Sequence, residues 1–448
     1  MLVELFHLLL TASTVLLKSD PMRKIIFSTF LAFISLITFA QDKTLRVDYI
    51  FSGTDRTQEI ALSEMTCFEG WAGRHVNMDK APVRGNGQII MSDASDGRVL
   101  YAQSFSTLFQ EWQTTEESVH TRKAFENVFL LPMPQAEALV KVELYDFRGG
   151  ISVSYTHKVK PDDVLIRRVS AVPAPHRYLS QGGPVEECID VAIVAEGYTS
   201  DEMELFYSDA KEAMEAILSH KPFDRYKDRF NFVAVALESE ESGVSVPGQG
   251  LWKNTALGSH FDTFYMDRYL TTLHLKNMHD RLCGIPYEHI VILANTETYG
   301  GGGIYNSYTL TTAHHKAFKP VVVHEFGHSF AGLADEYYYD DQFVEYYYPH
   351  CEPWEQNITT LHDFASKWED MLPKVVQIPA PAFEGNVWEK ISQGVPQETF
   401  VGVYEGAGYQ SKGVYRPFPD CRMKTNAADG FCPVCQRAIA RMIEFYTE

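Results

Sequence analysis

The sequence predicts a two-domain α+β protein in which an N-terminal antiparallel β-sandwich precedes an α/β domain. Three observations predict it. Short alternating apolar runs occupy the first part of the chain, a Pro- and Gly-rich segment follows, and strand-like and helix-like segments then alternate. With 448 residues, of which 45% are hydrophobic, the chain is long and apolar enough for two cores.

The charge balance excludes one class of partner. The chain has 39 Lys and Arg against 59 Asp and Glu, for a formal net charge of -20. Binding of nucleic acid requires a basic surface, so we expect no nucleic-acid partner.

Residues 1–40 are predicted to be a signal-peptide region, with Met22 as the true start. Arg23 and Lys24 form a basic start, residues 25–39 are mostly apolar, and Thr38 and Ala40 offer a small-residue cleavage site. The apolar stretch is shorter than the ~20 residues that span a bilayer. We therefore expect an exported protein that is secreted, periplasmic or at the cell surface, with no transmembrane anchor in the mature chain.

Residues 41–170 are predicted to form the β-sandwich. Turn residues separate the short β-rich runs at 45–51, 88–91, 98–103, 128–131, 140–145 and 151–157. No catalytic constellation occurs here, so we expect the chemistry in the second half of the chain.

Residues 171–186 are predicted to be a linker, and residues 187–448 a catalytic domain. Strands are expected at 189–195, 232–237 and 289–294. Thr199 and Glu202 form a capping box that opens a helix to about His220, and residues 260–282 are also expected to be helical.

Seven cysteines occur, four of them in the last hundred residues. Cys421 with the Cys432–Cys435 pair is compatible with a zinc knuckle, a redox pair or a disulfide staple. A zinc knuckle would need a second close pair of cysteines, and a redox pair would need a thioredoxin-like βαβ context. Neither occurs, which favours a disulfide staple that involves Cys351, Cys421, Cys432 and Cys435.

The most informative motif is His324-Glu325-Phe326-Gly327-His328. On a helix, histidines four residues apart leave the same face, so both imidazoles can bind one Zn²⁺ ion. Glu325 can reach the open position of that metal, which makes it the expected general base.

A catalytic zinc needs a third protein ligand. A continuing helix would carry Asp335 about 10 Å beyond His328, so the chain must turn back, and Gly332 is placed to end the helix with a positive φ. Asp335 is the favoured ligand and Glu336 the alternative, with Glu345 or Glu352 as more distant candidates.

The segment from Gly332 to Asp335 resembles the glycine turn of metzincins, with one extra residue before the glycine and Asp where His is usual. Met423 is placed for a Met-turn, the apolar floor below the metal in that group.

At larger scale the chain resembles the secreted zinc metallopeptidases of the IgA peptidase family, including the family's β-rich N-terminal domain. The residues that carry this resemblance are 193–198, 324–337, 404–409, 415–417, 421–423 and 431–435. The resemblance implies hydrolysis of peptide bonds with one catalytic zinc ion, and does not establish cleavage of immunoglobulin A.

The expected mechanism follows from this ligand set. Two imidazoles and a carboxylate leave one position for water, and Glu325 accepts its proton and passes it to the leaving amine. A second oxyanion donor is expected among Tyr305, Tyr308, Tyr337 and Tyr409.

The glycine-rich loop at 300–309 leads into a strand that could pair with an extended protein or peptide substrate. The alternative function is a secreted binding or adhesion protein with a structural or vestigial zinc site. The oligomeric state has no signal in the sequence.

Overall fold

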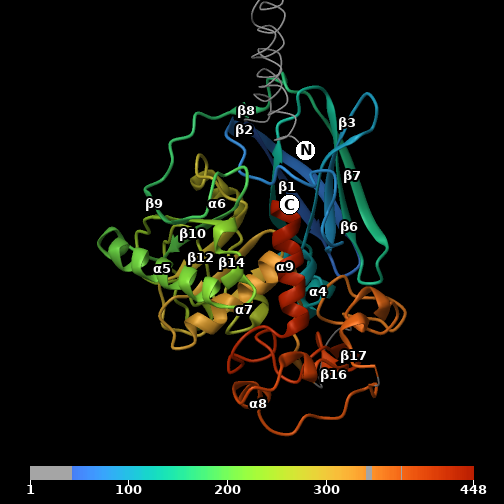
Figure 1. Ribbon diagram of the computed structural model, residues 1–448. Coiled ribbons are helices and arrows are strands. Elements are labelled where there is room, and N and C mark those ends of the chain that lie inside the picture. Colours follow the sequence, from blue (N-terminus) through green and yellow to red (C-terminus); the bar gives the residue numbers. More distant parts are fainter. Residues whose placement is uncertain (1–42, 340–345, 375) are drawn as a thin grey trace, which may run out of the picture.

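The computed structural model describes residues 43–339, 346–374 and 376–448 (Figure 1). The described chain is mixed α/β, with several sheets and few long helices. The predicted signal region and the start at Met22 lie outside the described residues. Among the helices that are described, none combines the length and the apolar character that crossing a bilayer requires.

The first part of the chain forms two four-stranded sheets, with strand orders β5-β1-β2-β8 and β4-β3-β6-β7. We call them the N-terminal sheets. Their strands are β1 (Lys43–Gly53), β2 (Gln58–Glu69), β3 (Gly87–Asp93), β4 (Val99–Phe105), β5 (Lys123–Pro132), β6 (Ala138–Tyr145), β7 (Ile151–Val159) and β8 (Arg167–Arg168). The helices α3 (Leu108–Trp112) and α4 (Glu116–His120) connect β4 to β5.

From Leu45 to Phe51, every second side chain of β1 is apolar and points into the core between the two N-terminal sheets. Leu45, Val47, Tyr49 and Phe51 of β1 are fully buried and lie in one core with apolar residues of β6. Each of the six runs expected from the sequence overlaps one of these strands. Strand β2 was not among the expected runs, and it pairs with β1 over its whole length.

A six-stranded sheet follows, with the order β13-β14-β12-β10-β11-β9. Its strands are β9 (His176–Gln181), β10 (Ile189–Glu196), β11 (Phe230–Val235), β12 (His289–Ala294), β13 (Gly301–Ile304) and β14 (Tyr308–Thr312). The four inner strands are parallel, and the two edge strands, β9 and β13, are antiparallel to their neighbours. The segment 171–186 is therefore not a simple linker, because β9 within it is paired with β11.

Helices cover one face of this sheet. They are α5 (Met203–Ser219), α7 (Phe318–Ala331) and α9 (Pro433–Thr447), and their apolar side chains form one core with Ile189, Val191 and Ile193 of β10 (Figure 1). The expected capping box is present, with Thr199 and Glu202 exchanging hydrogen bonds at the start of the 3₁₀ turn Ser200–Glu202 that leads into α5.

The helix expected at 260–282 is mostly absent. Only α6 (Leu275–Arg281) is α-helical. Before it, His260 and Thr271 exchange N–H···O hydrogen bonds of 3.0 and 3.2 Å, which folds the chain back on itself. Asp262, Phe264 and Tyr265 have positive φ, a conformation incompatible with a right-handed helix.

The rest of the chain is largely irregular. It contains α8 (Val387–Ser392) and a small sheet of β15 (Tyr338–Tyr339), β17 (Tyr409–Arg416) and β16 (Tyr404–Ala407). Further short 3₁₀ turns lie at Phe223–Arg225, Lys227–Arg229, Pro247–Gln249, Thr263–Tyr265, Phe364–Ser366, Glu369–Met371 and Gln397–Phe400.

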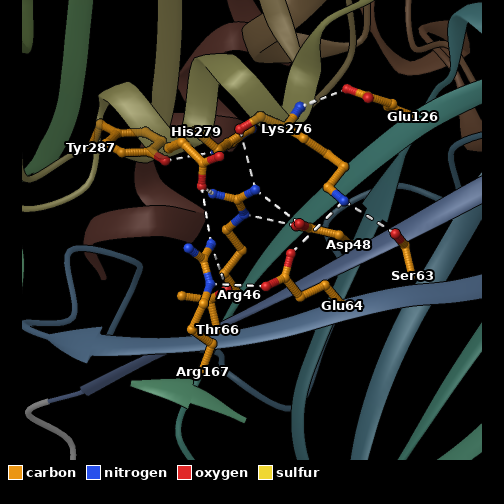
Figure 2. Close-up of polar contacts among 11 residues, drawn as sticks. Arg46, Asp48, Ser63, Glu64, Thr66, Glu126, Arg167, Lys276, His279 and Tyr287 are labelled. Carbon is orange, nitrogen blue, oxygen red and sulfur yellow. Dashed lines mark hydrogen bonds and ion pairs between the residues drawn. The ribbon is translucent and has the colours of Figure 1, made fainter. Parts of the chain in front are cut away.

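The N-terminal sheets pack on the second face of the six-stranded sheet. Ala192 and Val194 of β10 belong to the same core as the apolar residues of β1 and β6. At the edge of this contact, the buried Arg46 donates hydrogen bonds of 2.7 Å to the carboxylates of Asp48 and Asp280 (Figure 2). It also donates to the carbonyl of Lys276 in α6. The two parts of the chain thus share a continuous core.

Candidate active site

Helix α7 carries His324, Glu325 and His328. The helix forms because apolar side chains bury two of its sides, and Pro320 lies in its first turn, where a missing N–H costs nothing. Val322, Phe326 and Phe330 are fully buried against the sheet and α9. The two histidines are only partly buried and face a cleft.

Gly332 ends the helix and reverses the chain. It is the C-cap, with φ of 59° in the left-handed region, as its place in the sequence predicts. Its N–H donates to His328 O at 2.9 Å, and the N–H of Leu333 donates to Gly327 O at 3.2 Å. This turn brings Asp335 back beside the two histidines.

Three ligand atoms converge at one point. His324 Nε2 lies 3.0 Å from His328 Nε2, and Asp335 Oδ1 lies 3.1 Å from the first and 3.3 Å from the second. We call these three residues the His/Asp triad. Tetrahedral zinc with bonds of ~2.0–2.1 Å separates its ligand atoms by about 3.3 Å, so the spacing fits one such ion.

The hydrogen bonds of the histidines fix which ring nitrogens face Asp335. His324 Nδ1 lies 2.8 Å from Arg422 O and His328 Nδ1 lies 2.5 Å from Leu333 O. A carbonyl oxygen only accepts, so each neutral ring carries its hydrogen on Nδ1 and directs a lone pair from Nε2. Within the described structure, Asp335 Oδ1 is buried and accepts no hydrogen bond. When both rings are neutral, three lone pairs therefore face one another.

The other candidate ligands lie elsewhere. Glu336 turns away from the triad, and its Oε1 lies 3.1 Å from Cys435 Sγ. Glu352 accepts hydrogen bonds from Thr360 and from the N–H of Asp363. Glu345 lies outside the described residues.

The carboxylate of Glu325 lies beside the triad. It offers an oxygen within 4.8 Å of the imidazole nitrogens. Burial raises the pKa of Glu325, and the neighbouring His324 and His328 act against that rise. For His328, burial lowers the pKa, but the carboxylate of Asp335 outweighs it and raises the value to about 9 in the metal-free protein.

The glycine run before α7 forms strand β13 instead of a flexible loop. A Cβ at Gly301 would lie 2.9 Å from Glu325 Oε1, and one at Gly303 would lie 2.3 Å from Glu325 O. Glycine is therefore needed for β13 to pack directly on α7. Tyr269 forms a β-bridge with Gly301, so the outer side of β13 is not free along its whole length.

A cleft of about 840 Å³ opens at the triad, and both parts of the chain line it. From the N-terminal sheets and α3 come Arg84, Gln110, Glu111 and Tyr145. Burial raises the pKa of Glu111 to about 7, although the hydroxyl of Tyr269 donates to it. None of these residues belongs to a local motif, so none of them was predicted from the sequence.

The four candidate tyrosines differ in their hydroxyl partners. Tyr305 bonds Ser104 Oγ at 3.2 Å, Tyr308 donates to Thr272 O at 3.3 Å, and Tyr409 donates to Asp335 Oδ2. Tyr337 lines the cleft, its ring centroid 5.5 Å from that of Tyr409. Its hydroxyl alone among the four has no hydrogen-bond partner in the described part of the chain.

Met423 lies directly under α7. Its side chain is fully buried, and its Sδ would lie 2.9 Å from a Cβ placed on Gly327. The carbonyl of Met423 accepts a hydrogen bond of 2.8 Å from the N–H of Glu336. The segment after the triad and the segment around Met423 are therefore joined below the helix.

The disulfide staple expected from the sequence does not form. All seven cysteines are free thiols. Cys351 lies beside Gly149 and Arg84, apart from the other three. Cys421, Cys432 and Cys435 are buried together around Glu336, with the sulfurs of Cys421 and Cys435 3.8 Å apart.

Two family models, which describe two parts of one peptidase family, match the chain. Residues 178–400 and 389–443 match the family described as IgA Peptidase M64, and residues 36–156 match the Peptidase M64 N-terminus. No curated protein matches the chain. Because these matches cover most of its length, the chain belongs to the IgA peptidase M64 family, which makes it a peptidase that acts on a protein or peptide substrate.

Proposed function

We propose that this peptidase is an exported, zinc-dependent enzyme whose catalytic ion is held by the His/Asp triad. One observation carries the proposal: the lone pairs of His324 Nε2, His328 Nε2 and Asp335 Oδ1 converge at spacings of 3.0 to 3.3 Å. Three acceptors at that spacing repel one another unless a metal ion or a proton on His328 lies between them.

Zinc bound there supplies a Lewis acid that polarises the scissile carbonyl and acidifies a water molecule. Glu325 takes up the proton of the attacking water and delivers it to the leaving amine. Burial raises the pKa of this carboxyl towards the range in which a group can both accept and release a proton. We assign the second oxyanion donor to Tyr337, which lines the cleft and whose hydroxyl has no hydrogen-bond partner among the described residues.

The substrate site is the cleft between the two parts of the chain. We propose that an extended peptide lies along it, with the N-terminal sheets and α3 as one wall. The bridge between Tyr269 and Gly301 limits strand pairing along β13 to its last residues. Residues 41–170 then act as a β-sandwich that completes the cleft, and residues 187–448 as a zincin-like domain with Met423 as its Met-turn.

The test is a cleavage profile on a diverse peptide library, with and without a chelator. We expect cleavage that the chelator abolishes and added zinc restores. Glu325→Gln is expected to keep its zinc and to lose about 10²–10⁴-fold in kcat. The matched control, Glu215→Gln on the exposed face of α5, is expected to match the wild type.

Two results would overturn the proposal. Zinc-loaded protein without turnover on any peptide would favour a secreted binding or adhesion protein, and full activity of Glu325→Gln would remove the assigned base. Export is tested separately, by sequencing the N-terminus of the mature protein, which we expect to begin at Gln41.

A further inference from the structure

A second group of metal-binding side chains lies behind the triad. It comprises Glu336, Cys421, Cys432 and Cys435, each of which offers one ligand atom within 4.8 Å of the others. We call it the thiol cluster. All four residues are buried, and they come from the chain after α7, the segment before Met423 and the start of α9, which packs against α7 (Figure 1).

The sulfur spacing fits a tetrahedral ion. Cys421 Sγ and Cys435 Sγ lie 3.8 Å apart, and Cys435 Sγ lies 3.1 Å from Glu336 Oε1. Zinc–sulfur bonds of ~2.3 Å in tetrahedral geometry separate two sulfurs by about 3.8 Å. Directly bonded sulfurs lie only ~2.0 Å apart. The distance between the sulfurs of Cys421 and Cys435 therefore matches two ligands of one tetrahedral ion and not a disulfide.

One carboxylate oxygen of Glu336 has no partner among the described residues. Its Oε1 accepts a hydrogen bond of 3.1 Å from Asn357 Nδ2, which fixes the direction of the carboxylate. In the described structure its Oε2 is buried without any hydrogen-bond partner. A buried carboxylate oxygen in this state is costly unless a cation lies beside it.

A backbone N–H group and two buried arginines lie close to the cluster. The N–H of Cys432 lies 3.2 Å from Cys421 Sγ, a contact that stabilises a thiolate. Arg416 and Arg422 are both buried, and Arg422 directly follows Cys421 in the chain. Three thiolates and a carboxylate exceed the charge of one Zn²⁺ ion by two, and these guanidinium groups offset the excess.

We propose that Glu336, Cys421, Cys432 and Cys435 bind a second zinc ion in a closed structural site. Four protein ligands leave no open position for water, so this ion takes no part in hydrolysis. The proposal stands on the thiol cluster alone and does not depend on the function of the triad.

The second ion would hold the active site in place. Glu336 directly follows Asp335, and its N–H donates to Met423 O at 2.8 Å. Cys421 directly precedes Arg422, whose carbonyl orients His324 at 2.8 Å. Neighbouring residues thus belong to two different sites, and the ion joins the segments that position the ligands of the triad.

Zinc content per chain tests the proposal on full-length protein purified without chelators. We expect two equivalents in the wild type and loss of one in Cys435→Ser. Cys283→Ser changes a half-buried thiol outside the cluster and is expected to keep both. To separate loss of zinc from unfolding of Cys435→Ser, the intact cluster is also examined in a His324→Ala/His328→Ala double variant. This variant is expected to retain one equivalent, with Zn–S bonds of ~2.3 Å by X-ray absorption.

The outcomes separate the two sites. A double variant without zinc, or a disulfide among Cys421, Cys432 and Cys435 shown by thiol titration in denaturant, would overturn the second site and leave the proposed peptidase mechanism standing. A sulfur-bound ion in a wild type that holds no histidine-bound ion would support the second site and overturn the mechanism.

Discussion

The hydroxyl of Tyr409 donates a hydrogen bond to Asp335 Oδ2, while the other oxygen of the same carboxylate faces His324 and His328. Tyr409 lies far along the chain from Asp335 and has a positive φ of 67°. The N–H of the preceding residue, Gly408, donates to Asp335 O at 2.9 Å. Both the side chain and the backbone of Asp335 are therefore fixed by one turn.

Removal of this hydrogen bond should weaken metal binding. We expect Tyr409→Phe to fold normally and to bind zinc at the triad about 10–100-fold more weakly, because the carboxylate loses the group that orients it. Competition with a chromophoric chelator measures the affinity. The control is Tyr404→Phe, which removes a hydroxyl that donates to Phe400 O. Equal affinities in the two variants would contradict the role of Tyr409.

Tyr337 should act on turnover and not on metal binding. If its hydroxyl stabilises the oxyanion, Tyr337→Phe should lower kcat by about 10²–10³-fold with little change in KM or zinc content. Tyr308→Phe is the comparison, because that hydroxyl donates to Thr272 O inside the core. Steady-state kinetics on one cleaved peptide decides between the two. An unchanged kcat in Tyr337→Phe would remove it as the donor.

Local sequence patterns predicted much of the geometry of the candidate site. The spacing of His324 and His328 and the need for a glycine at position 332 are properties of a single helix and its end, so the sequence was enough to anticipate them. The alternating strands of the N-terminal sheets were found for the same reason, since burial on one face leaves its period in the sequence.

Contacts between distant segments could not be anticipated in this way. Strand β9 exists because β11 supplies its partner, and residues 260–274 fold back through the pairing of His260 with Thr271. Glu111 reaches the cleft only because α3 lies beside the six-stranded sheet. The cysteines were assigned to a staple because nothing in their spacing shows that Glu336 lies among them.

Close contact between Gly327 and Met423 should make α7 sensitive to a single methyl group. A Cβ at Gly327 would lie 2.9 Å from Met423 Sδ and 3.2 Å from the ring of Phe431. We expect Gly327→Ala to lower the free energy of unfolding by about 1–3 kcal/mol through overpacking. The loss of stability caused by Gly327→Ala should be smaller in a Met423→Ala background. A double-mutant cycle based on urea unfolding measures this difference.

The control for this cycle is Gly430→Ala, because the nearest atom to its Cβ would be 3.8 Å away, on His220. We expect it to change stability little. Identical costs of Gly327→Ala with and without the Met423 side chain would show that the two residues do not press on each other.

The contact around Arg46 should stabilise the junction between the N-terminal sheets and α6 (Figure 2). Arg46 and Asp48 are 2% and 1% exposed, so loss of the arginine leaves a buried carboxylate without its charge partner. Arg46→Met is expected to cost about 3–5 kcal/mol, measured by urea unfolding. Arg46→Met/Asp48→Leu should cost less than the single change, and Arg56→Met, at an exposed ion pair, almost nothing. A double variant no better than the single one would count against a buried-charge penalty.

Asp190 should make stability depend on pH. Burial raises the pKa of its carboxyl to about 7, partly opposed by the hydrogen bond of 3.0 Å from Asn231, and its Oδ2 has no partner among the described residues. The pKa in the unfolded chain is about 3.9. Between these values the folded protein keeps a proton that the unfolded chain has lost, so stability falls as the pH rises and the penalty is complete above pH 7.

Asp190→Asn removes this charge and can still accept the hydrogen bond from Asn231. We expect it to raise the free energy of unfolding by up to about 4 kcal/mol at pH 8 and by about 1.5 kcal/mol at pH 5, because each unit of pKa is worth about 1.4 kcal/mol. Urea unfolding at the two pH values measures the difference. Asp201→Asn, at an exposed carboxyl, should show no such trend. A gain that is equal at pH 5 and pH 8 would mean that packing, and not the proton, accounts for the effect of Asp190.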